Sequence, residues 1–454
     1  MTQHPDDEPI GREIAALARL AAPIVVAQLG LMAMGLVDVA ILGRSSSVEL
    51  AGAALGRSTG WAANAIALGL ASALDPLAAQ AVGAREEARA WAALVGTLRA
   101  CALAWVPTFA LAVLATLAFP ALGIEAAVAD RARAFLLAWA PSALGFVEFT
   151  ALRTFLNAHG TTRPAVIASL LANVVNALVC TALVRGDPAL VALGLPPVGL
   201  PALGATGAGL ASSIGAVVLC LAMVPAILRR RPRPGGPQPD PVPVRRVVRL
   251  GLPLGLQMLA EMGAFALVSV LAGRLGARVV SAHQIALGLA SFTFMGALGV
   301  SGATAVRVGH AVGAGRSPRR SGLVGIALGG SIMSIGAVAF ALAPRGLLRL
   351  FTDDAEVIEI GVPLLGLAAL FQLFDGVQVA ASGALRGAGD VRVPFLVNVA
   401  VYWGFALPVA LVLGFHFGLG ARGLWAGLTL GLMSAAAVLL ARFLHLTRRQ
   451  VARV

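Results

Sequence analysis

Hydrophobic residues gather into long runs along this chain, and short segments rich in Arg, Asp, Glu, Pro and Gly separate the runs. Each run has about the 20 residues that an α-helix needs to cross the hydrocarbon core of a bilayer. The pattern predicts an all-α membrane protein with twelve spanning helices. The predicted spans are residues 21–42, 58–80, 98–120, 134–155, 164–184, 204–228, 250–272, 281–306, 322–342, 360–385, 394–415 and 423–443.

Composition and charge agree with a membrane protein and predict its orientation. The chain is 59% hydrophobic and 12% charged, with a mean hydropathy of +0.89, which is too apolar for a soluble protein of 454 residues. Its net charge of +13 reflects arginines in loops, so we expect no nucleic-acid partner. Of the 34 arginines, 24 fall on the side that holds both tails, residues 1–16 and 444–454. The positive-inside rule predicts that this side is the cytoplasmic side of the cell (inner) membrane.

The two halves of the chain repeat each other at an offset of 230 residues. Segments that recur at this offset include Ala81–Ala84 at Ala311–Ala314, Gly43-Arg44 at Gly273-Arg274, and Pro164 at Pro394. The repeat predicts an N-lobe at 17–228 and a C-lobe at 247–443, each with six spans. A Pro- and Arg-rich segment, 229–246, should be a cytoplasmic linker that does not form a helix. Parallel repeats of this kind are typical of transporters.

Four carboxylates lie deep within the predicted spans: Asp38, Glu148, Glu261 and Asp375. Asp75, followed by Pro76, belongs to a helix end or break. Asp375 is near the centre of an apolar run, where a charge costs about 2.5–3.5 kcal/mol and usually marks an ion pathway. Asp38, Glu261 and Asp375 have no acidic counterpart in the other half. We therefore predict cation coupling at these three acids, because two acids that share one site hold either a proton or a metal cation.

Other polar side chains in the spans are candidates for lining a cavity. Asn173 and Asn176 share one predicted span with Cys180, and Asn176 and Cys180 lie four residues apart on one helix face. Gln284 is a further candidate, next to His283 at the start of another span. The three cysteines lie in apolar runs, so no disulfide framework is expected. We expect no cofactor other than a coupling ion.

Several segments resemble the multidrug and toxic compound extrusion (MATE) family, and in particular its bacterial NorM-like branch. They are PIVVAQLGLMAMGLVDVAILGR, HQIALGLASFTFM, AVGAGR and VQVAASGALRGAGDVRVPF. The resemblance implies a two-lobed antiporter that exports cationic, often aromatic drugs in exchange for Na⁺ or H⁺. It carries the acids of the branch onto Glu261 and Asp375, and an acid shared by several branches onto Asp38.

Two positions depart from the pattern of the branch. Phe371 replaces a Tyr that often lies four residues before the acid at position 375, and Cys180 replaces a better polar ligand. Both residues remain candidates for lining the substrate cavity. The possible metal at Glu261 and Asp375 is Na⁺, which we favour over H⁺ because two carboxylates supply more oxygen ligands than a single proton requires.

Two alternative functions remain open from the residues. A lipid-linked oligosaccharide flippase of related fold usually has basic residues in its cavity, and no arginine is predicted at mid-membrane depth. An intramembrane enzyme would need a catalytic constellation, and the six histidines lack catalytic or metal-ligand spacing. We therefore predict a non-enzymatic exporter of small organic cations that acts as a monomer in the bilayer.

Overall fold

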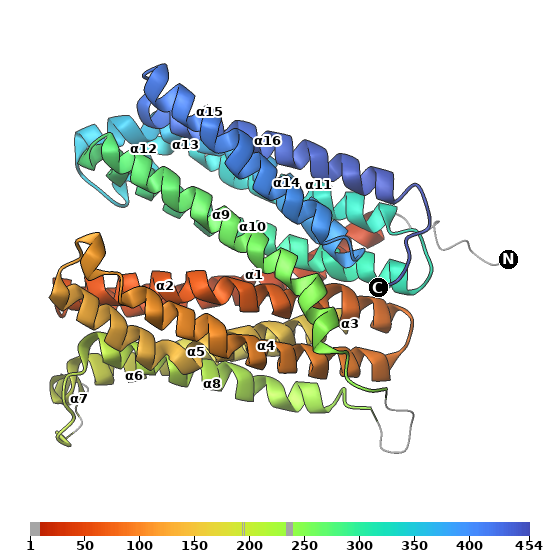
Figure 1. Cartoon of the computed structure of the whole chain (residues 1–454), viewed down its shortest axis with the longest axis horizontal. Coiled ribbons are helices and arrows are strands. Elements are labelled where there is room, and N and C mark those ends of the chain that lie inside the picture. Colours follow the sequence, from red (N-terminus) through yellow and green to blue (C-terminus); the bar gives the residue numbers. More distant parts are fainter. Residues whose placement is uncertain (1–9, 193, 195, 233–238) are drawn as a thin grey trace. The chain divides into compact units, whose positions relative to one another are not determined.

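A computed structural model describes the chain except for residues 1–9, 193, 195 and 233–238. Long α-helices follow one another along the sequence (Figure 1). The helices of the first half are α1 (Ile10–Gly43), α2 (Ser47–Ser72), α3 (Leu74–Gly83), α4 (Glu87–Thr116), α5 (Ala126–Ala158), α6 (Arg163–Arg185), α7 (Asp187–Ala192) and α8 (Gly204–Leu228). Those of the second half are α9 (Val244–Arg274), α10 (Ala277–Gly313), α11 (Arg319–Leu342), α12 (Pro344–Arg349), α13 (Ala355–Gly387), α14 (Arg392–Val401), α15 (Leu407–Leu411) and α16 (Gly420–Leu446).

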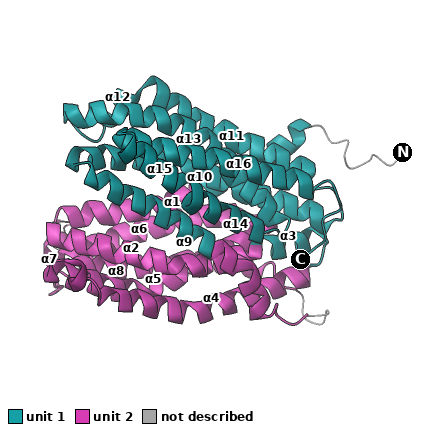
Figure 2. Cartoon of the chain, turned by 45° about the horizontal axis from the view of Figure 1, so that its top comes forward, with its two compact units in different colours: residues 1–25, 75–86, 256–454 teal, residues 26–74, 87–255 magenta. Residues whose placement is uncertain are grey.

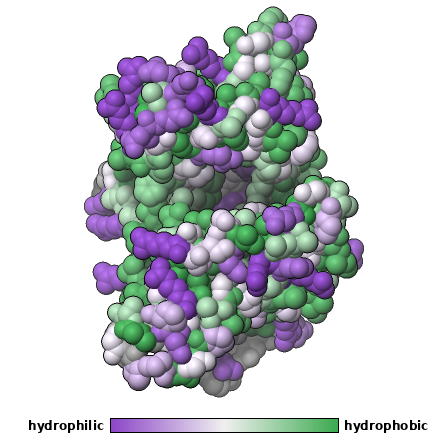
Figure 3. Space-filling view, turned by 90° about the vertical axis from the view of Figure 1, so that its left-hand side faces the viewer, coloured by the Kyte–Doolittle hydropathy of each residue, from purple (hydrophilic) through white to green (hydrophobic). Residues whose placement is uncertain are grey.

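Twelve segments of the described chain are helical, long and apolar enough to cross a membrane, and they match the twelve predicted spans. The all-α prediction is confirmed. Apolar side chains also cover much of the outer surface, as on α4, where Leu103 and Leu111 are 64% and 61% exposed. Figure 3 shows hydrophobic surface interrupted by separate hydrophilic patches. Such exposed apolar surface is expected where lipid replaces water as the solvent.

The first two spans begin eleven residues earlier than predicted. α1 starts at Ile10 because Glu13, which interrupts the apolar pattern, forms an ion pair with Arg307 of α10. α2 starts at Ser47, so that Arg57 lies inside the helix. The second span also breaks before Asp75 and Pro76, as expected at an X-Pro pair, and continues as α3. Polar residues can therefore be part of a helix when packing supplies them with partners.

The predicted linker is partly helical, contrary to expectation. α9 begins at Val244 and includes the last residues of the predicted linker, while 233–238 lie outside the described residues. Just before α9, the Val242 backbone N–H donates a hydrogen bond to the Ala92 carbonyl of α4 at 3.1 Å. The end of this segment is thus attached to α4.

The helices form two compact units (Figure 2). Unit 1 consists of residues 1–25, 75–86 and 256–454, and unit 2 of residues 26–74 and 87–255. In unit 1, α13 packs against α10, α11 and α16; in unit 2, α5 packs against α2, α4 and α8. Two of the boundaries fall within α1 and α9, so each of these helices contributes to both units. The division into lobes at 17–228 and 247–443 remains a prediction from the repeat.

Glycines allow α13 to pack closely against its neighbours in unit 1. A Cβ atom added to Gly376 would lie 2.9 Å from the Gly329 carbonyl carbon of α11. One added to Gly387 would lie 2.9 Å from the Ala305 Cα of α10. Real Cβ atoms essentially never approach backbone atoms so closely. Small residues at such crossings let helix backbones meet inside a membrane protein, which allows α13 to lie directly against α10 and α11.

Candidate functional site

Glu261 and Asp375, two of the acids predicted from the sequence, are brought together in unit 1. Glu261 is in the middle third of α9 and Asp375 in the middle third of α13. Their carboxyl groups are close enough for their charges to interact. Asp375 is 5% exposed, and Glu261 is partly exposed. In the part of the chain that the structure describes, neither acid forms an ion pair with a basic residue. We call Glu261 and Asp375 the acid pair.

Tyr402 adds a phenol to the acid pair. Its hydroxyl donates a hydrogen bond to Glu261 Oε1 at 3.4 Å and lies close enough to Asp375 to interact with that carboxylate as well. The side chain is only 1% exposed. It is the single tyrosine of the chain, and the sequence analysis did not assign it to the site. Its rarity was the available signal, but only tertiary structure shows that it faces the acids.

Tyr402 lies at the start of a π-helical turn. Tyr402 begins the π-helical segment Tyr402–Ala406, which interrupts the regular helix between α14 and α15. Such turns are rare, and they are frequent at functional sites. The adjacent Trp403 is 45% exposed, and its indole N–H donates a hydrogen bond to the Ala260 carbonyl of α9 at 3.0 Å. Two consecutive aromatic residues thus attach this segment to α9 beside Glu261.

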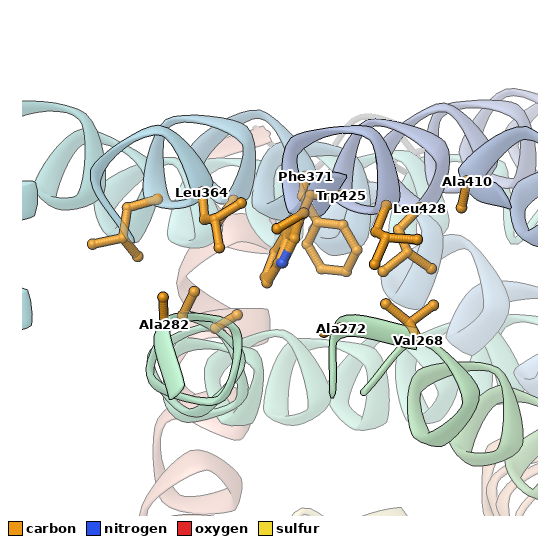
Figure 4. Packing of buried hydrophobic residues seen from close by; sticks show 14 of the residues in the cluster. Val268, Ala272, Ala282, Leu364, Phe371, Ala410, Trp425 and Leu428 are labelled. Carbon is orange, nitrogen blue, oxygen red and sulfur yellow. The ribbon is translucent and has the colours of Figure 1, made fainter. Parts of the chain in front are cut away.

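Aromatic rings form a continuous row next to the acid pair. The ring of Tyr402 lies 6.0 Å from that of Phe265, which lies 6.1 Å from that of Phe371. Phe371 in turn lies 5.8 Å from Trp425. Figure 4 shows Phe371 and Trp425 side by side in the hydrophobic core of unit 1. Phe371 is 4% exposed, so in this state it packs within the core one helical turn before Asp375.

His283 has partners that sequence spacing did not reveal. Trp425 Nε1 donates a hydrogen bond to His283 Nδ1 at 3.1 Å, and Ser269 Oγ lies 2.9 Å from His283 Nε2. The Ser269 hydroxyl donates to the Phe265 carbonyl, so its oxygen is free to accept from Nε2–H. An indole N–H can only donate, and Nδ1 must therefore be unprotonated. These contacts select the neutral Nε2–H tautomer and make His283 a structural link to the aromatic row.

The third predicted acid, Asp38, is in unit 2 and has a basic partner. Asp38 is 1% exposed, and its Oδ2 accepts hydrogen bonds from Arg57 Nη2 and Ser212 Oγ, each at 2.9 Å. Asn176 and Cys180 also face this carboxylate. Arg57 lies ten residues inside α2, although the predicted span begins only at residue 58. Its charge is paired with Asp38.

The remaining candidates are Asn173, Asn176 and Gln284, whose surroundings differ from those of the acid pair. Asn173 Nδ2 donates hydrogen bonds to the Gly30 and Ser169 carbonyls, at 2.8 and 2.7 Å, and so links α6 to α1 within unit 2. Asn176 is fully buried. Gln284 has an exposed side chain beside the buried His283. Among the described residues, no group of three or more His, Cys, Asp or Glu side chains is arranged to hold a metal ion.

Comparison with known proteins identifies the family. The sequence model of the MatE family matches residues 23–181 and 253–412. The chain belongs to the MATE family. It is 38% identical to a protein of Deinococcus radiodurans named "Probable multidrug resistance protein NorM", over 96% of each chain. It is 37% identical to a protein of the same name from Pseudomonas putida, over 94% of this chain and 93% of that one.

Solved structures show the same fold. The eukaryotic MATE transporter AtDTX14 covers 96% of each chain with a TM-score of 0.82 at 23% identity. An outward-facing multidrug resistance MATE family transporter covers 96% of each chain with a TM-score of 0.84 at 19% identity. The two matched segments of the MATE model correspond to the two halves of the sequence repeat, and the second contains all three residues of the site in unit 1.

Proposed function

We propose that this protein exports small organic cations through the membrane in exchange for a coupling cation that binds at the acid pair. The observation that carries the proposal is that Glu261 and Asp375, two carboxylates with no basic partner among the described residues, lie near each other and near Tyr402. The resemblance to proteins named as NorM multidrug resistance proteins supports drug export. We further propose a non-enzymatic, monomeric protein of the cell inner membrane with both termini in the cytoplasm.

The acid pair supplies a reason for exchange. Two unpaired carboxylates in a low-dielectric site repel each other, and a bound cation relieves that repulsion. A cationic drug is attracted by the same negative field, so drug and coupling cation compete. If each ligand binds the outward-open and inward-open states with different affinity, each shifts the equilibrium between them. Mutual exclusion combined with alternating access then gives antiport.

The ligand set favours Na⁺ over H⁺ as the coupling ion. Hard cations take oxygen ligands, and Glu261, Asp375 and Tyr402 bring four carboxylate oxygens and one phenol oxygen into one region of unit 1. The sequence suggested that Phe371 removes a phenol oxygen from this site. Tyr402, which comes from a different span, offers one in its place.

The test is the movement of ethidium in proteoliposomes driven by a Na⁺ gradient alone or a pH gradient alone. Glu261→Gln and Asp375→Asn retain the size of each side chain but remove the charge that the cation neutralises. We expect both variants to fall to the level of empty liposomes. The matched control is Glu359→Gln, which makes the same chemical change at an exposed acid that pairs with Arg345.

Two results would separately test the role of each acid and the identity of the coupling ion. Wild-type rates in either acid-pair variant, at equal amounts of inserted protein, would exclude that acid from coupling. Ethidium movement that ignores the Na⁺ gradient and follows the pH gradient would replace Na⁺ by H⁺ and leave the site unchanged.

A further inference from the structure

We propose that Arg57 is a tethered cation that keeps Asp38 neutralised, so that the exchangeable coupling cation binds only at the acid pair. Asp38 then has a structural role in unit 2 and does not bind the coupling ion. This inference rests on the proposed function, since it concerns which acids take part in the exchange. It also reverses the expectation from the sequence that Asp38 belongs to the coupling site.

Two acceptors on α1 hold the guanidinium of Arg57. Arg57 Nη2 donates to Asp38 Oδ2, and Nη1 donates to the Gly35 carbonyl, each at 2.9 Å. Gly35 lies three residues before Asp38, on the same face of α1. The fork geometry of a guanidinium suits two acceptors placed side by side. The contact is therefore a fixed two-point attachment rather than a flexible surface ion pair.

The surroundings of Arg57 are shaped to hold it. A Cβ atom added to Gly35 would lie 3.0 Å from Arg57 Nη1, so the glycine leaves the space that the guanidinium occupies. The guanidinium carbon lies 5.6 Å from the centre of the Phe135 ring of α5, within the range of a cation–π contact. The Arg57 side chain is 18% exposed and that of Asp38 is 2% exposed. Contacts from α1 and α5 thus position a charge that would otherwise be costly within a span.

Charge balance separates Asp38 from the acid pair. Arginine does not lose its proton in proteins, so Arg57 stays positive under all working conditions. The other groups that face Asp38 in the described chain are Ser212, Asn176 and the Cys180 thiol, which are neutral in their ordinary forms. A mobile cation that approached Asp38 would find its negative charge already neutralised and would be repelled by the guanidinium of Arg57. Among the residues that the structure describes, the acid pair has no such internal cation.

Ethidium export by single and double variants tests whether the acid at position 38 is needed. Asp38→Asn leaves a positive charge without its partner, and Arg57→Gln leaves a negative one, so we expect each single variant to lower ethidium export at least about tenfold. Asp38→Asn/Arg57→Gln removes both charges together. We expect the double variant to return to within about threefold of wild type, with the wild-type ion dependence.

The proposal is overturned if the double variant exports as poorly as Asp38→Asn although it reaches the membrane in wild-type amounts. It is equally overturned if Asp38→Asn alone exports at the wild-type rate, because the pair would then have no consequence. Arg345→Gln, which breaks an ion pair whose two side chains are more than 60% exposed, is the control and should leave export unchanged.

Two measurements on purified protein do not depend on transport. In thermal unfolding, the summed falls in Tm of the two single variants should exceed the fall of the double variant. A fall in the double variant equal to that sum would mean that the two residues do not interact and would refute the pair. Na⁺ in place of choline, or acidification, should raise the Tm of the double variant as much as that of wild type, and should not raise the Tm of Glu261→Gln. Loss of this cation response in the double variant would assign the exchangeable site to Asp38 and end the proposal.

The same measurements separate a failure of this inference from a failure of the proposed function. If wild-type proteoliposomes move no ethidium under either gradient, export of this cation is refuted, and the two Tm comparisons still decide whether Arg57 neutralises Asp38. If wild type exports and the double variant does not, the proposed function stands and the tethered cation is refuted.

Discussion

Replacing Tyr402 by Phe should weaken the binding of the coupling cation without unfolding the site. The substitution removes one hydroxyl, which is 3.4 Å from Glu261 Oε1, and keeps the ring 6.0 Å from that of Phe265. The phenol oxygen helps to orient Glu261 and offers an oxygen to a bound cation. Its loss should therefore raise the cation concentration required for half-maximal export.

The contact distance limits the size of the effect. A hydrogen bond to a charged acceptor contributes about 1.5–3 kcal/mol when its geometry is good. The O···O distance of 3.4 Å exceeds the usual 2.5–3.0 Å of such bonds, so we take about 1 kcal/mol. Since 1.4 kcal/mol corresponds to a factor of ten, the half-saturating cation concentration should rise about fivefold. The maximal rate should stay close to that of wild type.

The assay is ethidium efflux from proteoliposomes at a series of Na⁺ concentrations, with the amount of inserted protein measured in parallel. Trp403→Phe is the matched control, because it removes an aromatic N–H that donates to the same helix at Ala260 but not to the acid. An unchanged half-saturation in Tyr402→Phe would refute the reasoning, as would an equal shift in the control. A rise well above tenfold would mean that the hydroxyl contributes more than its long contact suggests.

Three further predictions test the supports of the site and one exposed loop. Gly376→Ala forces a Cβ atom against the α11 backbone, and thermal unfolding should show a loss of about 1–3 kcal/mol together with impaired export. Trp425→Phe leaves buried His283 Nδ1 without its donor and should cost about 1–3 kcal/mol in the same assay, whereas a change at an exposed tryptophan should not. A backbone hydrogen bond from Leu200 holds the pKa of Asp187 below its ordinary value, so the loop should gain stability from this acid above about pH 4 and lose it as the pH falls through the lowered pKa. Hydrogen exchange at the Leu200 amide should show this acid sensitivity in wild type and not in Asp187→Asn.

Local hydropathy was sufficient to predict the twelve spans, because an apolar run of membrane length has few alternatives to a spanning helix. The same local reasoning found Glu261 and Asp375, since a charge within an apolar run is conspicuous wherever it occurs. The break near Asp75 and Pro76 has a similarly local cause, because it depends on the missing N–H and the ring of proline. These properties belong to short stretches of chain and do not require knowledge of their neighbours in space.

Helix ends were harder to predict, because distant partners change the cost of a polar residue. Glu13 reads as the end of an apolar run, yet its ion pair with Arg307, 294 residues away in the chain, lets α1 continue through it. The predicted second span begins at residue 58, just after Arg57, because a charged residue interrupts the apolar pattern there too. Its pairing with Asp38, 19 residues away, places it inside α2.

Only the tertiary structure decided which polar groups meet. Tyr402, at the start of a π-helical turn, contacts Glu261 across 141 residues of sequence, and no short pattern in this chain indicates that contact. The Nε1–H of Trp425 finds His283 across 142 residues. Both contacts depend on which face each helix turns toward its neighbours, and glycine crossings and ring packing determine that face. The sequence by itself determined where the acids lie along the chain, and the packing determined that two of them share a phenol while the third has an arginine.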